Sequence, residues 1–267
     1  TGAQPIKSKK NTFTLTIESG GIVRTTGNSI AILAYGDNQT ITNNGIIQVT
    51  DSSSDNAIKA QGDTFILNNS GGTIEAPSYT VNVSGDSADI TNSGNINGTT
   101  QRAIYLNSTG HTITNESDGT IKAGEDDETN GWNATDKLAV ELKSSAVNLI
   151  LNNYGTINSG INTVKTESTG MILTNYSGGT ISAQTGGSAY KAIFVDGNDN
   201  IIKNYGTISA AGDTDSIKVG SGVTGTKIYV DGAPTFIGEI ELTDSTVAAN
   251  TTMYLGCSMT QDTTIEI

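Results

Sequence analysis

The chain has 267 residues, of which 34% are hydrophobic and only 5% aromatic, enough for a folded rod but little for a bulky globular core. Its formal net charge of -13 argues against a nucleic-acid partner, because such proteins present a positive stripe that replaces counterions. An acidic surface instead suits a protein that stays soluble outside a cell.

Hydropathy and cysteine content narrow the setting further. No stretch approaches about 18 consecutive apolar residues, so the sequence predicts neither a transmembrane segment nor a retained signal peptide. Cys257 is the only cysteine, which excludes an internal disulfide, and we expect it to pack as a small buried residue near the C-terminal end. The Ser, Thr, Asn and Gly-rich composition is nevertheless typical of extracellular proteins.

The N-terminal residues 1–11 contain three lysines and no strand pattern. We expect a lead-in there, either a cap that guards an exposed strand edge or a solvated tail. The alternation of apolar and polar residues over 13–17 then predicts the first strand.

Residues 12–222 are built from a repeated motif that reads apolar, any, Asn, any, Gly, any, Ile. Its clearest copy is 151–157, and three of the seven copies carry two extra residues before the glycine. The closing isoleucines of successive copies lie 22 to 36 residues apart, a period typical of stacked repeats. These closing residues are Ile47, Ile74, Ile96, Ile121, Ile157, Ile181 and Ile208.

A second pair of apolar residues, spaced by two, lies between successive motifs, and a turn glycine follows it in most repeats. Ile193, Val195 and Gly197 are one example. Each repeat therefore contains three short strands, and it can bury its inward side chains only by stacking on its neighbours. We predict an all-β fold, a single-stranded right-handed parallel β-helix (solenoid) of roughly nine coils with three short strands per coil.

The asparagine of the motif is expected to stabilise the stack rather than to catalyse a reaction. One turn position recurs directly above itself in a solenoid, so the side-chain amides can donate and accept along the rod. The glycine after the asparagine is expected to adopt a positive φ in the bend. We predict one structural ladder of Asn43, Asn68, Asn92, Asn115, Asn153, Asn175 and Asn204.

Residues 223–267 keep strand patterns but lose the ladder asparagine. We expect further strands at 227–230, 236–242, 253–255 and 264–267. The segment therefore reads as degenerate C-terminal coils or a capping segment of the same rod.

The sequence contains no constellation that predicts a catalytic, cofactor-binding or metal-binding site, and we expect no cofactor. His111 has no companion at metal-ligand spacing, and we expect it to be a solvated turn residue. Residues 85–88 read Gly-Asp-Ser-Ala and lack the second glycine of a serine-protease motif. The run 196–200 begins like a calcium loop, but Ile201 and Thr207 stand where that loop requires glycine and glutamate.

A polysaccharide lyase or hydrolase is the enzymatic alternative, because parallel β-helices often present carboxylates along one strand face. The outward column of the second strand places no two carboxylates next to each other. Glu141 and Lys165 are neighbours there, and we expect an exposed cross-strand ion pair between them. The column consists of Leu33, Lys59, Asn82, Tyr105, Glu141, Lys165, Phe194 and Lys218.

Two exterior features are candidate partner-binding sites. Tyr154, Tyr176 and Tyr205 each follow a ladder asparagine, so we expect them to stack on one outer corner. Such a stack either stabilises neighbouring coils or offers a platform for sugar rings or a partner protein. The insertion 124–137 carries Trp132 beside a run of four acidic residues, and it is either a binding loop that folds back toward the tyrosines or a solvated loop.

Residues 204–210 read Asn-Tyr-Gly-Thr-Ile-Ser-Ala, residues 179–183 repeat the Gly-Thr-Ile-Ser-Ala part, and Ala-Ile-Phe-Val stands at 192–195. These phrases resemble bacterial autotransporter passenger domains, especially adhesin-like ones, and the resemblance covers 12–242. It implies a right-handed β-helix that is displayed at, or released from, a Gram-negative outer membrane by a β-barrel translocator outside this chain.

From this resemblance we expect a non-enzymatic cell-surface or secreted passenger domain that acts in adhesion or self-association. The expected partner is a protein or glycan on a host or neighbouring cell, or another copy of the chain, and not a nucleic acid. A polysaccharide-active enzyme and a purely structural stalk remain the alternatives.

Overall fold

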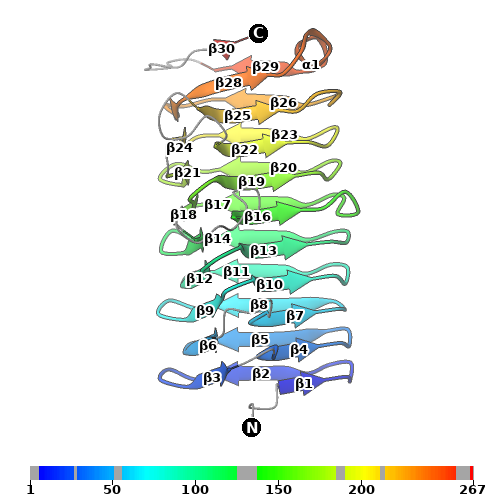
Figure 1. Cartoon of the computed structure of the whole chain (residues 1–267), viewed down its shortest axis with the longest axis vertical. Helices are drawn as coiled ribbons and strands as arrows, with labels where there is room; N and C mark the ends of the chain where they lie inside the picture. Colours follow the sequence, from blue (N-terminus) through cyan, green and yellow to red (C-terminus); the bar gives the residue numbers. More distant parts are fainter. Residues whose placement is uncertain are drawn as a thin grey trace.

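The computed structural model describes residues 6–26, 29–50, 56–124, 137–184, 190–210, 214–256 and 265–266. Three parallel sheets run along the molecule, and each coil of the chain contributes one strand to each sheet in turn (Figure 1). The result is a β-solenoid of about nine turns with three strands per coil, which confirms the predicted parallel β-helix. The N-terminus lies at one end of the rod and the C-terminus at the other (Figure 1).

The first sheet, sheet A, holds the strand that precedes the motif in each coil. Its strands are β1 (Ile6–Ser8), β4 (Ile32–Ala34), β7 (Ile58–Ala60), β10 (Tyr79–Val83), β13 (Arg102–Leu106), β16 (Leu138–Leu142), β19 (Asn162–Thr166), β22 (Lys191–Val195), β25 (Asp215–Val219), β28 (Glu239–Leu242) and β30 (Ile265–Glu266).

Sheet B holds the strand that ends at the ladder asparagine in the seven coils that carry the motif. Its strands are β2 (Thr14–Ile17), β5 (Gln39–Asn43), β8 (Thr64–Asn68), β11 (Asp89–Asn92), β14 (Thr112–Asn115), β17 (Ile150–Asn153), β20 (Ile172–Asn175), β23 (Ile201–Asn204), β26 (Lys227–Val230) and β29 (Thr252–Leu255).

Sheet C holds the strand that contains the closing isoleucine in the seven coils that carry the motif. Its strands are β3 (Ile22–Thr25), β6 (Ile46–Val49), β9 (Thr73–Ala76), β12 (Asn95–Gly98), β15 (Thr120–Ala123), β18 (Thr156–Ser159), β21 (Thr180–Ala183), β24 (Thr207–Ala210) and β27 (Thr235–Ile237).

The core is a set of columns in which the same motif position recurs in each coil. In sheet C the seven closing isoleucines pair directly with one another, and each of them is fully buried. Burying one such side chain contributes about 1.5–3 kcal/mol relative to leaving it in water. A repeat that could not hold these side chains alone therefore becomes stable when neighbours cover it on both sides.

Both ends of the chain differ in detail from the sequence-based expectation. Residues 6–8, expected within a lead-in without strands, form β1 and pair with β4, so the strand predicted at 13–17 is the second one. The strand predicted at 236–242 is two strands, β27 and β28, on different sheets. Gly238 separates them with a left-handed φ of 100°, a conformation that glycine adopts readily.

One short helix, α1 (Ser245–Asn250), was not predicted. It occupies the last turn from sheet A to sheet B, between β28 and β29. The Asp244 carboxylate caps it by accepting the N–H groups of Thr246 and Val247, each at 2.9 Å. Periodicity does not reveal a helix this short, because it spans less than two turns.

Candidate functional site

The predicted asparagine ladder is confirmed. The seven side chains occupy one register position at the end of sheet B, and all are fully buried. In each of the six links the amide Nδ2 donates to the Oδ1 of the next asparagine at 2.8 or 2.9 Å. The ladder satisfies polar groups inside the rod and faces no solvent, so its role is structural.

The motif glycine has a different role from the one predicted. None of the seven motif glycines has a positive φ. A Cβ on Gly155 would lie 2.2 Å from the carbonyl oxygen of Glu116 and 2.4 Å from that of Gly119, both in the preceding coil. The position therefore requires glycine because neighbouring coils approach closely at this corner.

The predicted stack of Tyr154, Tyr176 and Tyr205 is also confirmed; we call it the tyrosine strip. The rings of Tyr154 and Tyr176 are stacked, with centroids 4.0 Å apart and planes 9° apart. Tyr205 continues the strip more loosely, 6.5 Å from Tyr176 and tilted by 31°. The strip lies at the corner between sheets B and C, directly outside the asparagine ladder, and Tyr154 is 36% exposed.

The stacking determines which parts of the tyrosines can meet a partner. Tyr154 and Tyr176 cover each other's facing ring surfaces, so their edges and hydroxyl groups remain for contacts. A hydrogen bond with Tyr176 raises the pKa of Tyr154, and partial desolvation adds to this effect. The strip therefore offers apolar ring edges together with hydroxyl groups.

A second pair of stacked tyrosines, which the sequence analysis missed, lies farther along the rod. Tyr229 and Tyr254 have ring centroids 4.3 Å apart and planes 5° apart. Together with Tyr205, Asp231 and Leu255 they line a groove of about 330 Å³. The sequence could have predicted this pair, because Tyr229 and Tyr254 occupy the same position in β26 and β29.

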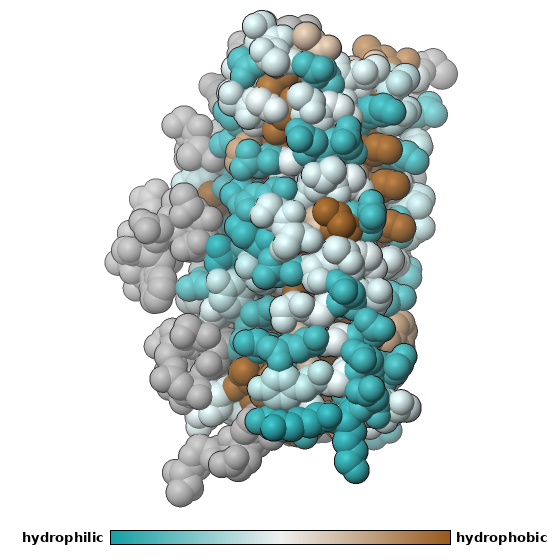
Figure 2. All heavy atoms as spheres, turned by 90° about the vertical axis from the view of Figure 1, so that its right-hand side faces the viewer, coloured by the Kyte–Doolittle hydropathy of each residue, from teal (hydrophilic) through white to brown (hydrophobic). Residues whose placement is uncertain are grey.

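Isoleucines add to the apolar character of the same stretch of sheet B. Ile150, Ile172 and Ile201 pair in register on its outer face, and Ile150 is 40% exposed. The side of the rod that Figure 2 shows is mainly hydrophilic, with apolar groups in a short column and in a few separate patches. The later coils of sheet B thus carry a row of apolar exterior positions, while Ile22 and Ile237 are exposed on sheet C and Phe65 on an early coil of sheet B.

Trp132, the other candidate partner-binding residue, lies outside the described residues, as do most of its loop and Cys257. The strands on either side of the loop are β15 of sheet C and β16 of sheet A. The loop therefore starts and ends at the corner between sheets C and A, whereas the tyrosine strip follows sheet B.

The outer column of sheet A has the predicted register from Leu33 to Lys218, but the expected ion pair is wrong. Glu141 is buried and pairs with Arg102, and its other oxygen lies 3.5 Å from Lys143. Lys165 instead pairs with Glu167 at 2.7 Å. The register predicted the adjacency correctly, but the partners come from the preceding strand, β13, and from the residues just after β16 and β19.

Two carboxylates do come together at the C-terminal end of this column. Asp215 and Glu241 share a hydrogen bond, and Lys218 pairs with Glu241 and lies 3.9 Å from Asp215. Burial, followed by the bond to Glu241 and its charge, raises the pKa of Asp215 to about 6. Burial alone would raise the pKa of Glu241, but hydrogen bonds with Lys218 and Asp215 lower it overall. The sequence analysis missed the pair because it did not extend the column to β28.

The prediction of a solvated His111 is wrong. Its side chain is only 1% exposed, and Nδ1 accepts the backbone N–H of Ala88 at 3.1 Å. Burial lowers the pKa of His111, although the charge of Asp86 opposes this shift. Strand alternation could have predicted the burial of His111, because it lies two residues before the inward Ile113.

The calcium-like run 196–200 is a turn held by its own asparagine. Asn200 is fully buried; its Oδ1 accepts the N–H of Met171 at 2.8 Å, and its Nδ2 donates to the carbonyl of Gly197 at 2.7 Å. Within the described ranges, no group of three or more His, Cys, Asp and Glu side chains is placed to hold a metal ion.

Two further findings bear on identity. The part of the chain that the structure describes contains no helix long and apolar enough to cross a membrane. Comparison of the chain with protein-family models, with curated proteins and with solved structures finds no match to any of them.

Proposed function

We propose that this chain is a non-enzymatic passenger domain of a bacterial cell surface, which acts in adhesion or self-association through the exterior of its β-helix. Its partner is a protein or glycan on a host or neighbouring cell, or another copy of the rod. The proposal places the chain at the Gram-negative outer membrane or in secreted form.

The observation that carries the proposal is the row of tyrosines, with isoleucines beside it, along one stretch of the rod. The tyrosine strip runs along three coils, and the groove beside Tyr229 and Tyr254 extends it toward the C-terminal end. Soluble proteins seldom expose contiguous apolar surface without a use for it. Tyrosine suits such a surface, because it offers a rigid apolar ring with a polar tip.

Replacement of the tyrosine strip tests the proposal. We expect Tyr154→Ser, Tyr176→Ser and Tyr205→Ser, singly and together, to fold like the parent by circular dichroism. The triple variant should lose cell aggregation when displayed on bacteria, or lose binding of the isolated domain to a glycan array or to cells. Each single variant should weaken the same readout by a smaller factor.

The control changes the same outer corner in coils that lack tyrosine. Asn44 and Asn69 precede the strip at that corner, and Nδ2 of Asn69 donates to Oδ1 of Asn44 at 2.7 Å. The double variant Asn44→Ser and Asn69→Ser should aggregate or bind like the parent. If the triple tyrosine variant also behaves like the parent in bacterial aggregation and in binding to cells, the adhesin proposal fails and a structural stalk is favoured.

A polysaccharide-active enzyme is the second candidate, and the carboxyl pair of Asp215 and Glu241 favours it. A carboxyl group with a pKa near 6 has the property of a general acid, which glycoside cleavage requires to protonate the leaving oxygen. Incubation with a panel of neutral and acidic polysaccharides should then release reducing ends or unsaturated products, and Asp215→Asn should abolish the release. An absence of cleavage in the parent protein eliminates this candidate.

A further inference from the structure

One corner turn of the rod is a residue shorter than its neighbours. The turn from sheet A to sheet B has four residues at 35–38, 84–87 and 107–110, but only three at 61–63, although the flanking strands pair in register. The last residue of each longer turn is left-handed, with a φ of 53° at Asn38 and 55° at Ser87. Asp63, the last residue of the short turn, is not left-handed.

The missing residue interrupts the hydrogen bonds between coils at this corner. The N–H of Thr12 donates to the carbonyl of Asp37 at 2.9 Å, and the N–H of Ser87 donates to that of Thr109 at 2.9 Å. In the two coils that lie between Thr12 and Ser87, the equivalent backbone N–H groups belong to Asn38 and Asp63. Neither of these N–H groups has a hydrogen-bond partner among the described residues. Two backbone donors are therefore left over at this corner.

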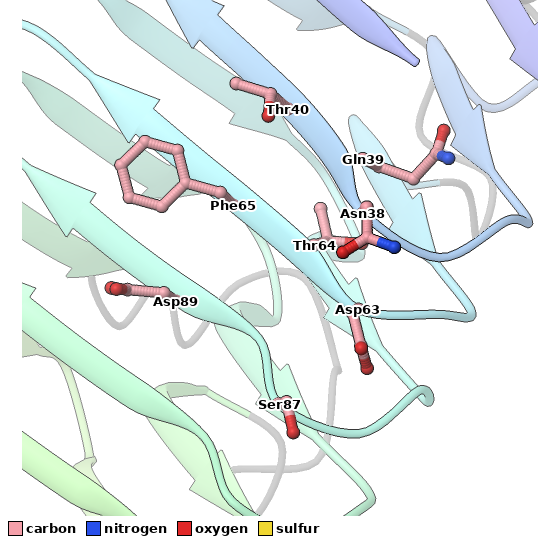
Figure 3. Close-up of a pocket in the computed structure, with 8 residues that line it drawn as sticks. All are labelled: Asn38, Gln39, Thr40, Asp63, Thr64, Phe65, Ser87 and Asp89. Carbon is pink, nitrogen blue, oxygen red and sulfur yellow. The ribbon is translucent and has the colours of Figure 1, made fainter. Parts of the chain in front are cut away.

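The short turn also opens a cavity, which we call the notch. It has a volume of about 340 Å³, within the range of small-molecule sites. Phe65 and Asp89 lie on its sheet side, on the neighbouring strands β8 and β11, while Asn38, Asp63 and Ser87 lie at three successive turns (Figure 3).

The groups around the notch combine an apolar ring with acceptors and donors. Phe65 is 37% exposed and lies in one outward column between Thr40 and Asp89. The carboxylates of Asp63 and Asp89 have no ion pair or hydrogen bond within the described part of the chain. Partial burial raises the pKa of Asp89, so its charge gains from a hydrogen-bond donor supplied by a ligand.

We infer that the notch binds one neutral pyranose ring of a glycan. A pyranose presents a face of C–H groups to an exposed aromatic ring, and each of its hydroxyl groups both donates and accepts a hydrogen bond. The two carboxylates accept from such hydroxyls, while the free N–H groups of Asn38 and Asp63 donate to them. The inference does not rest on the tyrosine strip, because the notch lies at the opposite edge of sheet B and ends two coils before the strip begins.

Other ligand classes match the notch less well. A calcium ion requires about six to eight oxygen ligands and has no use for two N–H donors or an aromatic ring. A phosphate or other anion is repelled by Asp63 and Asp89. A cationic amine pairs with the carboxylates but leaves both N–H donors without an acceptor.

Saturation-transfer NMR with the methyl glycosides of glucose, galactose, mannose and N-acetylglucosamine tests the inference. At least one of them should give ring-proton signals with the whole chain, with a Kd on the order of 1 mM, as expected for a single sugar ring. Insertion of one serine after Asp63 restores the four-residue turn and fills the notch, so it should keep the parent Tm and weaken binding at least about tenfold. Phe65→Ser should weaken binding by a similar factor.

Two surface variants and a calcium titration complete the design. Asp89→Thr gives this position the residue type that Thr112 has at the same position in the next coil. It should weaken binding, and it tests the notch even if the serine insertion disturbs folding. Asp118→Asn, an exposed carboxylate far from the notch, should bind like the parent. The inference is overturned if no glycoside gives a signal, if binding survives both Phe65→Ser and Asp89→Thr, or if calcium alone raises the Tm of the parent but not of Asp89→Thr.

Discussion

The side-chain Nδ2 of Asn115 donates to Oδ1 of Asn153 at 2.9 Å, and neither side chain is exposed to solvent. Asn115 in turn accepts from Asn92, so it has a ladder partner in the coil on either side. Asn204 has a ladder partner on one side only, because Val230 occupies the next position. The ladder therefore has interior members and a terminal member that can be compared directly.

We predict that Asn115→Ala lowers the free energy of unfolding by about 2–4 kcal/mol, because two buried amides each lose a partner. Asn204→Ala should cost roughly half as much, since only one neighbouring amide is affected. Urea unfolding followed by circular dichroism measures both values. Thr114→Ala, on the outward face of the same strand, is the control, and equal losses at Asn115 and Asn204 would contradict the ladder as a chain of coupled bonds.

Gly155→Ala tests the close approach of coils at the corner between sheets B and C. The added Cβ would meet backbone atoms, which cannot move aside as a flexible side chain can. We expect a loss of about 1–3 kcal/mol in unfolding free energy, the usual cost of overpacking. Ser177→Ala, an exposed residue at the same corner of the next coil, should change stability by less than about 0.5 kcal/mol. If Gly155→Ala left the free energy of unfolding unchanged, the coils would be able to move apart at this corner.

His111 predicts a loss of stability on mild acidification. Burial lowers its pKa below the ordinary value of 6.5, so the unfolded chain binds a proton that the folded chain resists. This contribution to stability is present above about pH 6.5 and falls as the pH drops toward the folded-state pKa.

The variant His111→Asn isolates this effect. Asn200 occupies the same column, and its Oδ1 accepts the N–H of Met171 as His111 Nδ1 accepts that of Ala88. His111→Asn should therefore keep the acceptor, match the parent near pH 8 and lose less stability than the parent near pH 5. Parallel pH profiles of Tm for the two proteins would refute the assignment.

Asp215 predicts the opposite pH dependence. Its pKa rises from 3.8 to about 6 on folding, so the folded chain binds the extra proton, and the stabilisation is complete below about pH 4. It is lost as the pH rises through about 6. Asp215→Asn mimics the protonated form and can still donate to Glu241.

We expect Asp215→Asn to raise the Tm by roughly 2–4 °C near pH 8 and to leave it unchanged near pH 4. Differential scanning calorimetry at several pH values provides the measurement. Asp118→Asn should show no such dependence on pH. A Tm difference of the same size at both extremes would mean that a contact other than proton binding is responsible.

The sequence by itself determined the stacking of the rod. In a solenoid each residue meets the residue at the same position one coil away, so a repeated position predicts a contact without knowledge of the rest of the fold. For this reason the recurrence of Asn153 and Asn175 predicted the buried ladder, and the recurrence of Tyr154 and Tyr176 predicted their stacked rings. The alternation of the strand also indicates that His111 points inward, but the prediction of a solvated turn residue did not use it.

The tertiary structure alone decided the features that break the repeat. The choice of basic residue that pairs with Glu141 depends on the reach of side chains from neighbouring coils. The environment of Asp215 depends on the carboxylate of Glu241 in β28, which lies beyond the last copy of the motif. The notch depends on a turn that is one residue short while the strands around it keep their register. Such features arise where neighbouring coils differ, and the repeat pattern cannot predict them because it records only what the coils share.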